Sequence, residues 1–194
     1  MAPTLLSPDF SALQMEANPT WHTPRCIVRP YCEADIEPIA KGANNPKIAK
    51  GMRNTFPQPY TIESARSYMA MVNAQSPLQS FVISRRDDSE VLGSFGFQVK
   101  DDINYRTLEI GYWVAEDHWG QGYATEVIST MTKWAFETLA HIIRIEANVF
   151  EGNVGSSRVL EKAGYALEGR RRKAIEKDGV VLDVLTYCIF RDGY

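Results

Sequence analysis

One stretch decides the fold of this chain: Trp113-Val114-Ala115-Glu116-Asp117-His118-Trp119-Gly120-Gln121-Gly122-Tyr123-Ala124-Thr125. It follows an apolar run, Leu108 to Val114, that predicts a buried strand, and it continues into Thr125 to Leu139, which predicts an amphipathic helix. The two glycines allow a tight turn into the helix and close approach of a ligand to the backbone. The first N–H groups of the helix then remain free at the positive end of its dipole, which favours a phosphate or pyrophosphate. The stretch therefore predicts a phosphorylated ligand.

The glycine turn by itself is also compatible with other kinds of site. Two glycines before a helix also occur in plain turns, and a phosphate-binding module of another kind stays open. A dinucleotide-binding fingerprint fits poorly, because its third glycine falls on Thr125 and too little chain follows for a doubly wound sheet. A P-loop is excluded, because no Gly-Lys-Ser/Thr follows.

A second motif runs from Asn153 to Tyr165 and predicts a polar loop, a short helix and a glycine stop. Ser156 or Asn153 can cap this helix, and Gly164 suits the left-handed position after its last turn. Taken alone, the motif is typical of a capped surface helix.

Together, and separated by a predicted strand from Ile142 to Val149, the two motifs resemble the acetyl-CoA-binding core of the GNAT N-acetyltransferases. More narrowly, the chain is similar to the RimJ/RimL-like branch of that superfamily. The residues that carry this resemblance are Ile110-Gly111-Tyr112-Trp113-Val114, the Gly-Gln-Gly turn, Asn153 with Ser156, Leu167-Glu168-Gly169, Asp178-Gly179, Asp183-Val184 and Tyr187. It runs from about Arg25 to the C-terminus and is densest from Glu109 onward.

The resemblance implies a GNAT fold of the α+β (mixed α/β) class, with a central, mostly antiparallel, splayed sheet of about seven strands flanked by about four helices. The local patterns agree with it. They predict strands at Cys26–Arg29, Ser80–Arg86, Val91–Val99 and Leu108–Ala115, and helices from about Glu33 to Gly42 and, after a Thr61 cap, to about Asn73.

The turn Asp178-Gly179 predicts a final hairpin in which Lys177 faces Val180. Carried along the strands, this register places Ala174 opposite Asp183 and Arg170 opposite Tyr187, with Asp183 diagonal to Arg172. A bulge in either strand would shift these pairs.

Composition and charge limit the possible partners. With 194 residues, 44% of them hydrophobic, the chain predicts a single domain at residues 23–194 behind an N-terminal extension, residues 1–22. A net charge of −3 gives no footprint for nucleic acid, and the run Arg170-Arg171-Arg172-Lys173 is the one basic exception. Three scattered cysteines predict reduced thiols and no metal site. No signal peptide or membrane span is expected, and the protein is predicted to be cytoplasmic.

By resemblance, the site residues for acetyl-CoA (CoA) can be named. The backbone of Tyr112, Trp113 and Val114 is expected to bond the pantetheine arm, with an N–H near Val114 stabilising the oxyanion, and Asn153 is expected to order the arm. At Trp119 the superfamily often has Gln or Arg, so any bond donated there is expected from the backbone alone. The amides expected to hold the pyrophosphate are those of Trp119, Gly120, Gln121, Gly122, Tyr123, Ala124 and Thr125.

The catalytic expectations are Ser156 and Glu109. Ser156 matches the proposed proton donor to the leaving thiolate in RimL-like enzymes, although a plain helix cap explains it equally well. Many GNAT enzymes use a tyrosine one turn later, where this chain has Leu160. Glu109 is the favoured general base, with Glu146 and Glu168 as rivals; a structural role for Glu109, or proton loss to bulk water, is a further alternative.

The sequence thus predicts an acetyl-CoA-dependent N-acetyltransferase that transfers an acetyl group directly to a primary amine. The acceptor is either a small-molecule amine or a peptide or protein N-terminus, and the Pro- and Asn-rich segment Asn45 to Tyr60 is expected to form the lid of its cleft. A non-catalytic module that binds CoA or acetyl-CoA is the alternative. Neither nucleic acid, membrane nor metal is expected as a partner, and both a monomer and a homodimer are compatible with the sequence.

Overall fold

The first strand lies earlier in the chain than the sequence predicted. The computed structural model describes residues 19–193, so most of the expected extension, residues 1–22, lies outside the described residues. Strand β1 (Trp21–His22) pairs antiparallel with β2 (Cys26–Arg29). The sheet therefore begins two residues before the expected domain start at residue 23.

The described residues form one sheet of eight strands in the order β1-β2-β3-β4-β5-β6-β8-β7. Every neighbouring pair is antiparallel except β5 and β6, which are parallel. The mixed α/β, mostly antiparallel fold is confirmed, with one strand more than the seven expected. The remaining strands are β3 (Ser80–Arg85), β4 (Val91–Val99), β5 (Thr107–Val114), β6 (Arg144–Phe150), β7 (Ala166–Lys177) and β8 (Val180–Phe190).

Five α-helices lie in the described part of the chain, one more than the four expected, because a single turn follows Asn45. The helix expected from Glu33 starts as a 3₁₀ turn, η2 (Glu33–Asp35), before it becomes α-helical. The α-helices are α1 (Ile36–Ala43), α2 (Pro46–Ala49), α3 (Ile62–Asn73), α4 (Tyr123–Thr138) and α5 (Val154–Lys162). Thr61 caps α3, as predicted, by accepting the amide of Ser64.

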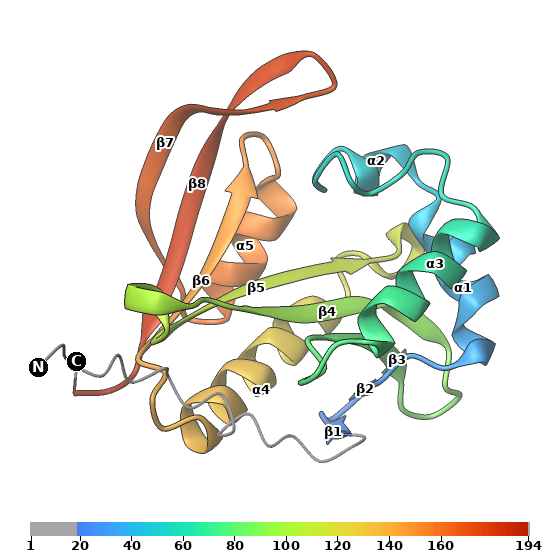
Figure 1. The fold of residues 1–194 in the computed structure, drawn as a ribbon, viewed down its shortest axis with the longest axis horizontal. Helices are drawn as coiled ribbons and strands as arrows, with labels where there is room; N and C mark the ends of the chain where they lie inside the picture. The colour runs from blue at the N-terminus through green and yellow to red at the C-terminus, as the bar shows by residue number, and fades with distance from the viewer. Residues whose placement is uncertain (1–18, 194) are drawn as a thin grey trace, which may run out of the picture.

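The splay of the sheet is confirmed and lies between β5 and β6. These strands pair over only three residues, Thr107 to Glu109 opposite Arg144 to Glu146. On its other side β5 stays paired with β4 as far as Val114. Past Glu109 the edge of β5 that faces β6 is therefore open, and Figure 1 shows β6, β7 and β8 turning away from β4 and β5.

Two apolar clusters hold the layers together. The predicted apolar stripe of α4 is buried in the larger cluster, between the helix and strands β2 to β6. A smaller cluster packs α1 and α3 against Val82 of β3, and its buried members include the loop residues Tyr31 and Tyr60. The buried members of the α4 stripe are Val127, Ile128, Met131, Ala135 and Leu139, and Trp134 is partly buried against them.

The final hairpin has the predicted turn but a different register beyond it. Asp178 and Gly179 both adopt positive φ, and Lys177 pairs with Val180. A bulge follows between the pairs Arg171–Val184 and Ile175–Leu182. Between these pairs β7 has three residues, Arg172 to Ala174, whereas β8 has only Asp183. The predicted pairing of Ala174 with Asp183 is therefore wrong.

The bulge has a polar cause at Asp183. Its carboxylate accepts a hydrogen bond from the backbone N–H of Lys173 at 2.7 Å, and Lys173 has φ 50°. The same carboxylate forms an ion pair with Arg170. A second irregularity after Leu167 shifts the register again. Arg170 consequently pairs with Leu185 and not with Tyr187 as predicted, and Tyr187 pairs with Leu167 instead.

Candidate active site

The splay between β5 and β6 opens into a cleft of about 1820 Å³. Pockets for a single small ligand usually measure about 300–1,000 Å³, so this cleft has room for two substrates together. It brings together every site residue expected from the sequence except Gln121, whose side chain instead donates to the carbonyl of Asp117. The expected residues that line it are Glu109, Tyr112, Trp113, Val114, Trp119, Gly120, Gly122, Tyr123, Ala124, Thr125, Asn153 and Ser156.

The turn before α4 has the geometry of an anion site. Gly120 and Gly122 have φ of 74° and 85°, in the left-handed region that side chains rarely adopt. Gly122 is the N-cap of α4 and no side chain caps the helix. The first amides of this 16-residue helix therefore have no intrahelical acceptor, and they lie at the edge of the cleft with the positive end of the helix dipole.

The side chain of Trp119 has an internal partner. Its indole Nε1 donates to the carbonyl oxygen of Val114 at 2.6 Å. The bond is internal, and it ties the turn to the end of β5. The indole itself is 45% exposed and forms part of the cleft wall.

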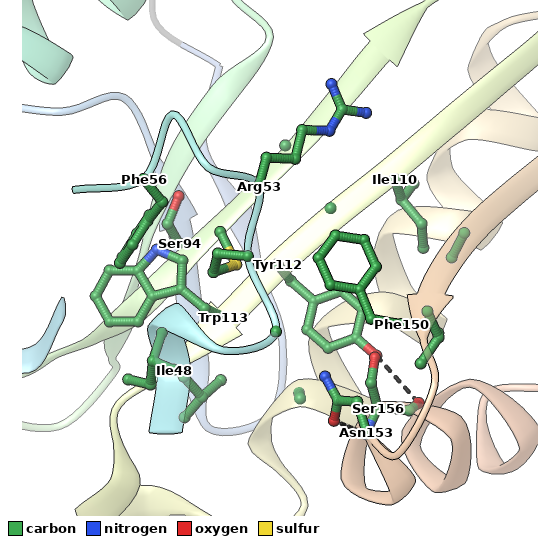
Figure 2. Close-up of a pocket in the computed structure, with 18 of the residues that line it drawn as sticks. Ile48, Arg53, Phe56, Ser94, Ile110, Tyr112, Trp113, Phe150, Asn153 and Ser156 are labelled. Carbon is green, nitrogen blue, oxygen red and sulfur yellow. Dashed lines mark hydrogen bonds between the residues drawn. The ribbon is translucent and has the colours of Figure 1, made fainter. Parts of the chain in front are cut away.

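Ser156 is not the cap of α5, because Asn153 fills that role. The Oδ1 of Asn153 accepts the backbone N–H of Ser156 at 3.1 Å, which leaves the Ser156 hydroxyl for another partner. That partner is the phenol of Tyr112, whose oxygen lies 2.7 Å from Ser156 Oγ and 3.2 Å from the Ser156 carbonyl oxygen (Figure 2). Burial raises the pKa of Tyr112 to about 12, so the phenol is neutral at physiological pH.

The sequence did not reveal the role of the Tyr112 side chain, which joins the central strand to the start of α5. The position at which many GNAT enzymes carry a tyrosine acid is Leu160, which is fully buried in the core. The hydroxyl of nearby Tyr165 pairs with Thr132 away from the cleft. Ser156 and Tyr112 are thus the two hydroxyl groups that meet beside the splay.

Glu109 lies in the cleft, but in an ion-paired setting. It is only 9% exposed, and Lys100 Nζ and Arg53 Nη2 approach its two carboxylate oxygens at 2.5 and 3.0 Å. Burial alone would raise the pKa of Glu109, but the hydrogen bond and charge of Lys100, with the charge of Arg53, outweigh it and lower the pKa. This environment makes Glu109 a weak base and favours the structural alternative.

The two rival carboxylates are also paired. Arg144 binds Glu146 at 2.9 Å and Glu168 at 2.5 Å. The hydrogen bond from Arg144 lowers the pKa of Glu168, whose side chain does not line the cleft. All three candidate bases therefore already neutralise a cation of the protein.

A segment that we call the crossing segment, residues 45–57, spans the cleft and includes α2. At one end Asn45 donates to Glu116 at 2.7 Å, and at the other Asn54 Nδ2 donates to the carbonyl of Glu176 on the hairpin at 3.4 Å. Between them, a Cβ placed on Gly51 would lie 2.8 Å from Asn153 Nδ2. Figure 1 shows α2 and the β7–β8 hairpin projecting on the same side of β5. The crossing segment makes up most of Asn45 to Tyr60, the range predicted to form the lid of the acceptor cleft.

Aromatic side chains from the crossing segment, from Tyr60 just after it and from β5 form one wall of the cleft. The ring of Phe56 lies 4.8 Å from that of Tyr60 and 6.4 Å from that of Trp113, measured between centroids. Figure 2 shows Phe56 and Trp113 beside Ile48, with Tyr112 between this group and Ser156. We call these three rings, Phe56, Tyr60 and Trp113, together with the aliphatic side chain of Ile48, the aromatic wall.

Within residues 19–193, no three or more His, Cys, Asp or Glu side chains are grouped in a way that could hold a metal ion. No helix in that range is long and apolar enough to cross a membrane. All three cysteines are free thiols; Cys26 and Cys188 are buried and Cys32 is exposed. In the basic run, Arg170 is used in ion pairs with Glu151 and Asp183, and Arg171 lines the cleft.

Comparisons with known proteins agree with this geometry. The family model described as acetyltransferase (GNAT) domain matches residues 25–166. The uncharacterized N-acetyltransferase YoaA of Bacillus subtilis (strain 168) is 31% identical over 175 residues, which cover 89% of this chain and 97% of YoaA. The uncharacterized N-acetyltransferase p20 of Bacillus licheniformis is 29% identical over 179 residues, which cover 90% and 98%.

Solved structures show the same fold. Mycobacterium smegmatis RimJ in complex with CoA-disulfide superposes with a TM-score of 0.76 at 23% identity, over 90% of this chain and 87% of that one. The microcin C7 self-immunity acetyltransferase MccE, in complex with acetyl-CoA and AMP, gives a TM-score of 0.74 at 20% identity, over 87% and 93%. Related chains thus bind CoA or acetyl-CoA on this fold.

Proposed function

The chain belongs to the GNAT acetyltransferase family, and from this premise we propose that it transfers the acetyl group of acetyl-CoA directly to a primary amine. The observation that carries the proposal is the open edge of β5, which ends beside the uncapped glycine turn of α4. An extended pantetheine arm fits such an edge as an added strand along Tyr112, Trp113 and Val114. The pyrophosphate then reaches the amides of residues 119–125.

The residues of the cleft suit such a transfer. Acetyl-CoA supplies the thioester, and the cleft holds it beside the amine in attack geometry, which is a large source of acceleration in such reactions. A backbone N–H near Val114 stabilises the charge that develops on the carbonyl oxygen. As the C–N bond forms and the C–S bond breaks, Ser156 donates its hydroxyl proton to the sulfur and takes a proton back from water, which balances the proton that the amine gives up. The amine loses its proton to water, since the carboxylates of the cleft are ion-paired.

For the acceptor, the cleft favours a primary amine with an apolar body over a polycation. The aromatic wall offers apolar surface next to the reaction point. A polyamine or aminoglycoside would need free carboxylates, and Glu109 and Glu146 are already paired with Lys100, Arg53 and Arg144. Both a small-molecule amine and the first residue of a peptide satisfy this description.

The test is the release of CoA thiol from acetyl-CoA with a panel of amines. The panel holds phenylethylamine, tryptamine, free amino acids, spermidine, an aminoglycoside and short peptides with free N-termini that begin with small or aromatic residues. Gly122→Trp should abolish release, because a side chain there is strained at φ 85° and its Cβ would lie 3.4 Å from Arg25 Nη2, so the turn cannot keep its geometry. Gly179→Trp is the matched control and should retain activity, because this glycine has φ 80° at the hairpin tip and a Cβ added there would meet no atom within 4 Å.

The outcomes separate the alternatives. Release that depends on an apolar amine and is lost only in Gly122→Trp supports the proposal and names the acceptor class. A preference for spermidine or the aminoglycoside contradicts the role of the aromatic wall. Tight CoA binding without release with any acceptor favours the non-catalytic CoA-binding module, and equal binding of ATP or NAD contradicts a CoA site altogether.

A further inference from the structure

Arg25, just before β2, reaches across to the turn that begins α4 and contacts three of its residues. Its Nη1 donates to the carbonyl oxygen of Gln121 at 3.0 Å, and its Nε donates to Glu126 Oε2 at 2.7 Å. The guanidinium carbon lies 4.6 Å from the centroid of the Tyr123 ring, which it covers. The backbone N–H of Arg25 also donates to Glu126 Oε1 at 2.7 Å. One arginine thus fixes the glycine turn from the side of the first strands.

The bond to Gln121 controls the direction of an amide in the proposed pyrophosphate site. The carbonyl of Gln121 and the N–H of Gly122 belong to one peptide unit, and this unit is not among the cis peptides of the described chain. In a trans peptide the C=O and N–H point in opposite directions. Because Arg25 holds the carbonyl, the Gly122 N–H is directed away from Arg25. Gly122 lines the cleft, and its N–H is one of the amides expected to bind phosphate.

The bond to Glu126 changes the charge at the same place. Glu126 lies in the first turn of α4, where its carboxylate would repel an anion at the helix N-terminus. Burial opposes its ionisation, but hydrogen bonds from Thr23 and Arg25 outweigh burial and lower the pKa of Glu126. The carboxylate is therefore ionised at neutral pH, and Arg25 neutralises it within hydrogen-bond distance.

We propose that Arg25 is a positioning residue for the pyrophosphate of acetyl-CoA: it aims the Gly122 amide through Gln121 and cancels the negative charge of Glu126 beside the site. This inference rests on the proposed function, because it needs acetyl-CoA to bind at the turn. The proposal adds to the cofactor site a residue outside the glycine motif, from the N-terminal part of the chain.

The experiment compares donors that have and lack the phosphates in Arg25→Met and Arg25→Lys. With acetyl-CoA, Arg25→Met should raise KM, and the Kd for CoA measured by calorimetry, about tenfold, which equals about 1.4 kcal/mol, while kcat at saturation changes less than about twofold. With S-acetylpantetheine, which has no phosphate, KM should change less than about twofold. Arg25→Lys should be intermediate, since lysine keeps the charge but cannot make the forked contacts.

Arg191 provides the matched control at the other end of α4. Its guanidinium covers the ring of Phe136 and donates to the carbonyls of Leu139 and Ile142, so Arg191→Met removes the same kinds of contact away from the cleft. Arg25→Met additionally removes the ion pair with Glu126. Arg191→Met should lower Tm and leave the Kd for CoA unchanged. Equal loss of affinity for acetyl-CoA and S-acetylpantetheine in Arg25→Met, or a wild-type Kd for CoA, would overturn this inference alone. A wild-type protein that binds no CoA would overturn the proposed function together with it.

Discussion

Replacing Tyr112 with phenylalanine tests how the hydroxyl of Ser156 is held for proton transfer. The substitution removes one oxygen atom and keeps the ring in place. It deletes the contacts of the phenol with Ser156 Oγ at 2.7 Å and with the Ser156 carbonyl at 3.2 Å. The backbone of residue 112, which is expected to bond the pantetheine arm, is unchanged, so binding and proton transfer are affected separately.

The expected magnitudes follow from these two contacts. A net hydrogen bond is worth about 0.5–1.5 kcal/mol, so losing both contacts in Tyr112→Phe should cost about 1–3 kcal/mol of unfolding free energy. In a domain of this size each kcal/mol lowers Tm by about 2–4 °C. If the phenol aligns Ser156 through one such bond in the transition state, kcat falls about tenfold, while KM for acetyl-CoA stays within about twofold.

Tyr165→Phe is the matched control. Its hydroxyl is also buried and lies 2.7 Å from one serine-like partner, Thr132, away from the cleft. Tm by calorimetry should show a loss of stability in both variants, the smaller one in Tyr165→Phe because it loses one contact instead of two. Steady-state kinetics with saturating acceptor should show a loss of kcat in Tyr112→Phe alone. In the double variant Tyr112→Phe/Ser156→Ala, kcat should be no lower than in Ser156→Ala, because the two residues act as one unit.

Two results would contradict a role of the Tyr112 phenol in proton transfer. If kcat falls equally in Tyr112→Phe and Tyr165→Phe, the effect is one of stability. If Ser156→Ala lowers kcat but Tyr112→Phe does not, the phenol has no part in orienting the donor.

Three further predictions concern the base, the pH range and the strand packing. In Glu109→Gln, kcat should fall less than about tenfold and the acidic limb of the pH–rate profile should remain, because a general base is worth about 10²–10⁴ and the lowered pKa makes Glu109 a poor one. The unfolding free energy, followed by denaturant titration, should decrease as pH rises from 10 to about 12. Burial raises the pKa of Tyr60 and Tyr112 to about 12, so these phenols ionise in the unfolded chain at a lower pH than in the folded one. Tyr112 alone contributes up to about 3 kcal/mol to this decrease. Gly93→Ala should lower the unfolding free energy by at least about 3 kcal/mol, because the added Cβ would lie 2.0 Å from the backbone carbonyl oxygen of Trp113 on β5. In the control Gly111→Ala the added Cβ meets no atom within 4 Å, so the stability derived from Tm should stay within about 0.5 kcal/mol of wild type. Equal Tm values for the two variants would contradict the packing of β4 on β5.

The local parts of the site were predictable because local physics determines them. A positive φ at Gly122 and an asparagine at the start of α5 act within a few residues, so sequence order alone indicates the turn and the capped helix. The same holds for the Asp178-Gly179 turn. The choice of Asn153 over Ser156 as the cap needed the structure, because both side chains can accept an amide.

Contacts between distant segments were not predictable in this way. Lys100 meets Glu109 only because β4 and β5 pair in a register that places Gln98 opposite Glu109. The bulge in β7 depends on the hydrogen bond that the Lys173 backbone N–H donates to the Asp183 carboxylate, and no turn motif in the sequence predicts this contact. Arg25 reaches residues almost 100 positions later in the chain, through strand pairing at the start of the sheet.

The open edge of β5 also bears on the solubility of this protein. Unpaired strand edges are templates on which other chains add strands, and they promote aggregation. Here the open part of the edge lies inside the molecule, between β6 and the crossing segment, and not at the rim of the sheet. The crossing segment is anchored on both sides of this cleft, through Asn45 to Glu116 and through Asn54 to the hairpin, so a second polypeptide strand would have to enter beneath it to pair with the edge. Covering an unpaired edge with a loop or helix is a common protection against strand addition, and here it leaves β5 unpaired without recruiting another copy of the chain.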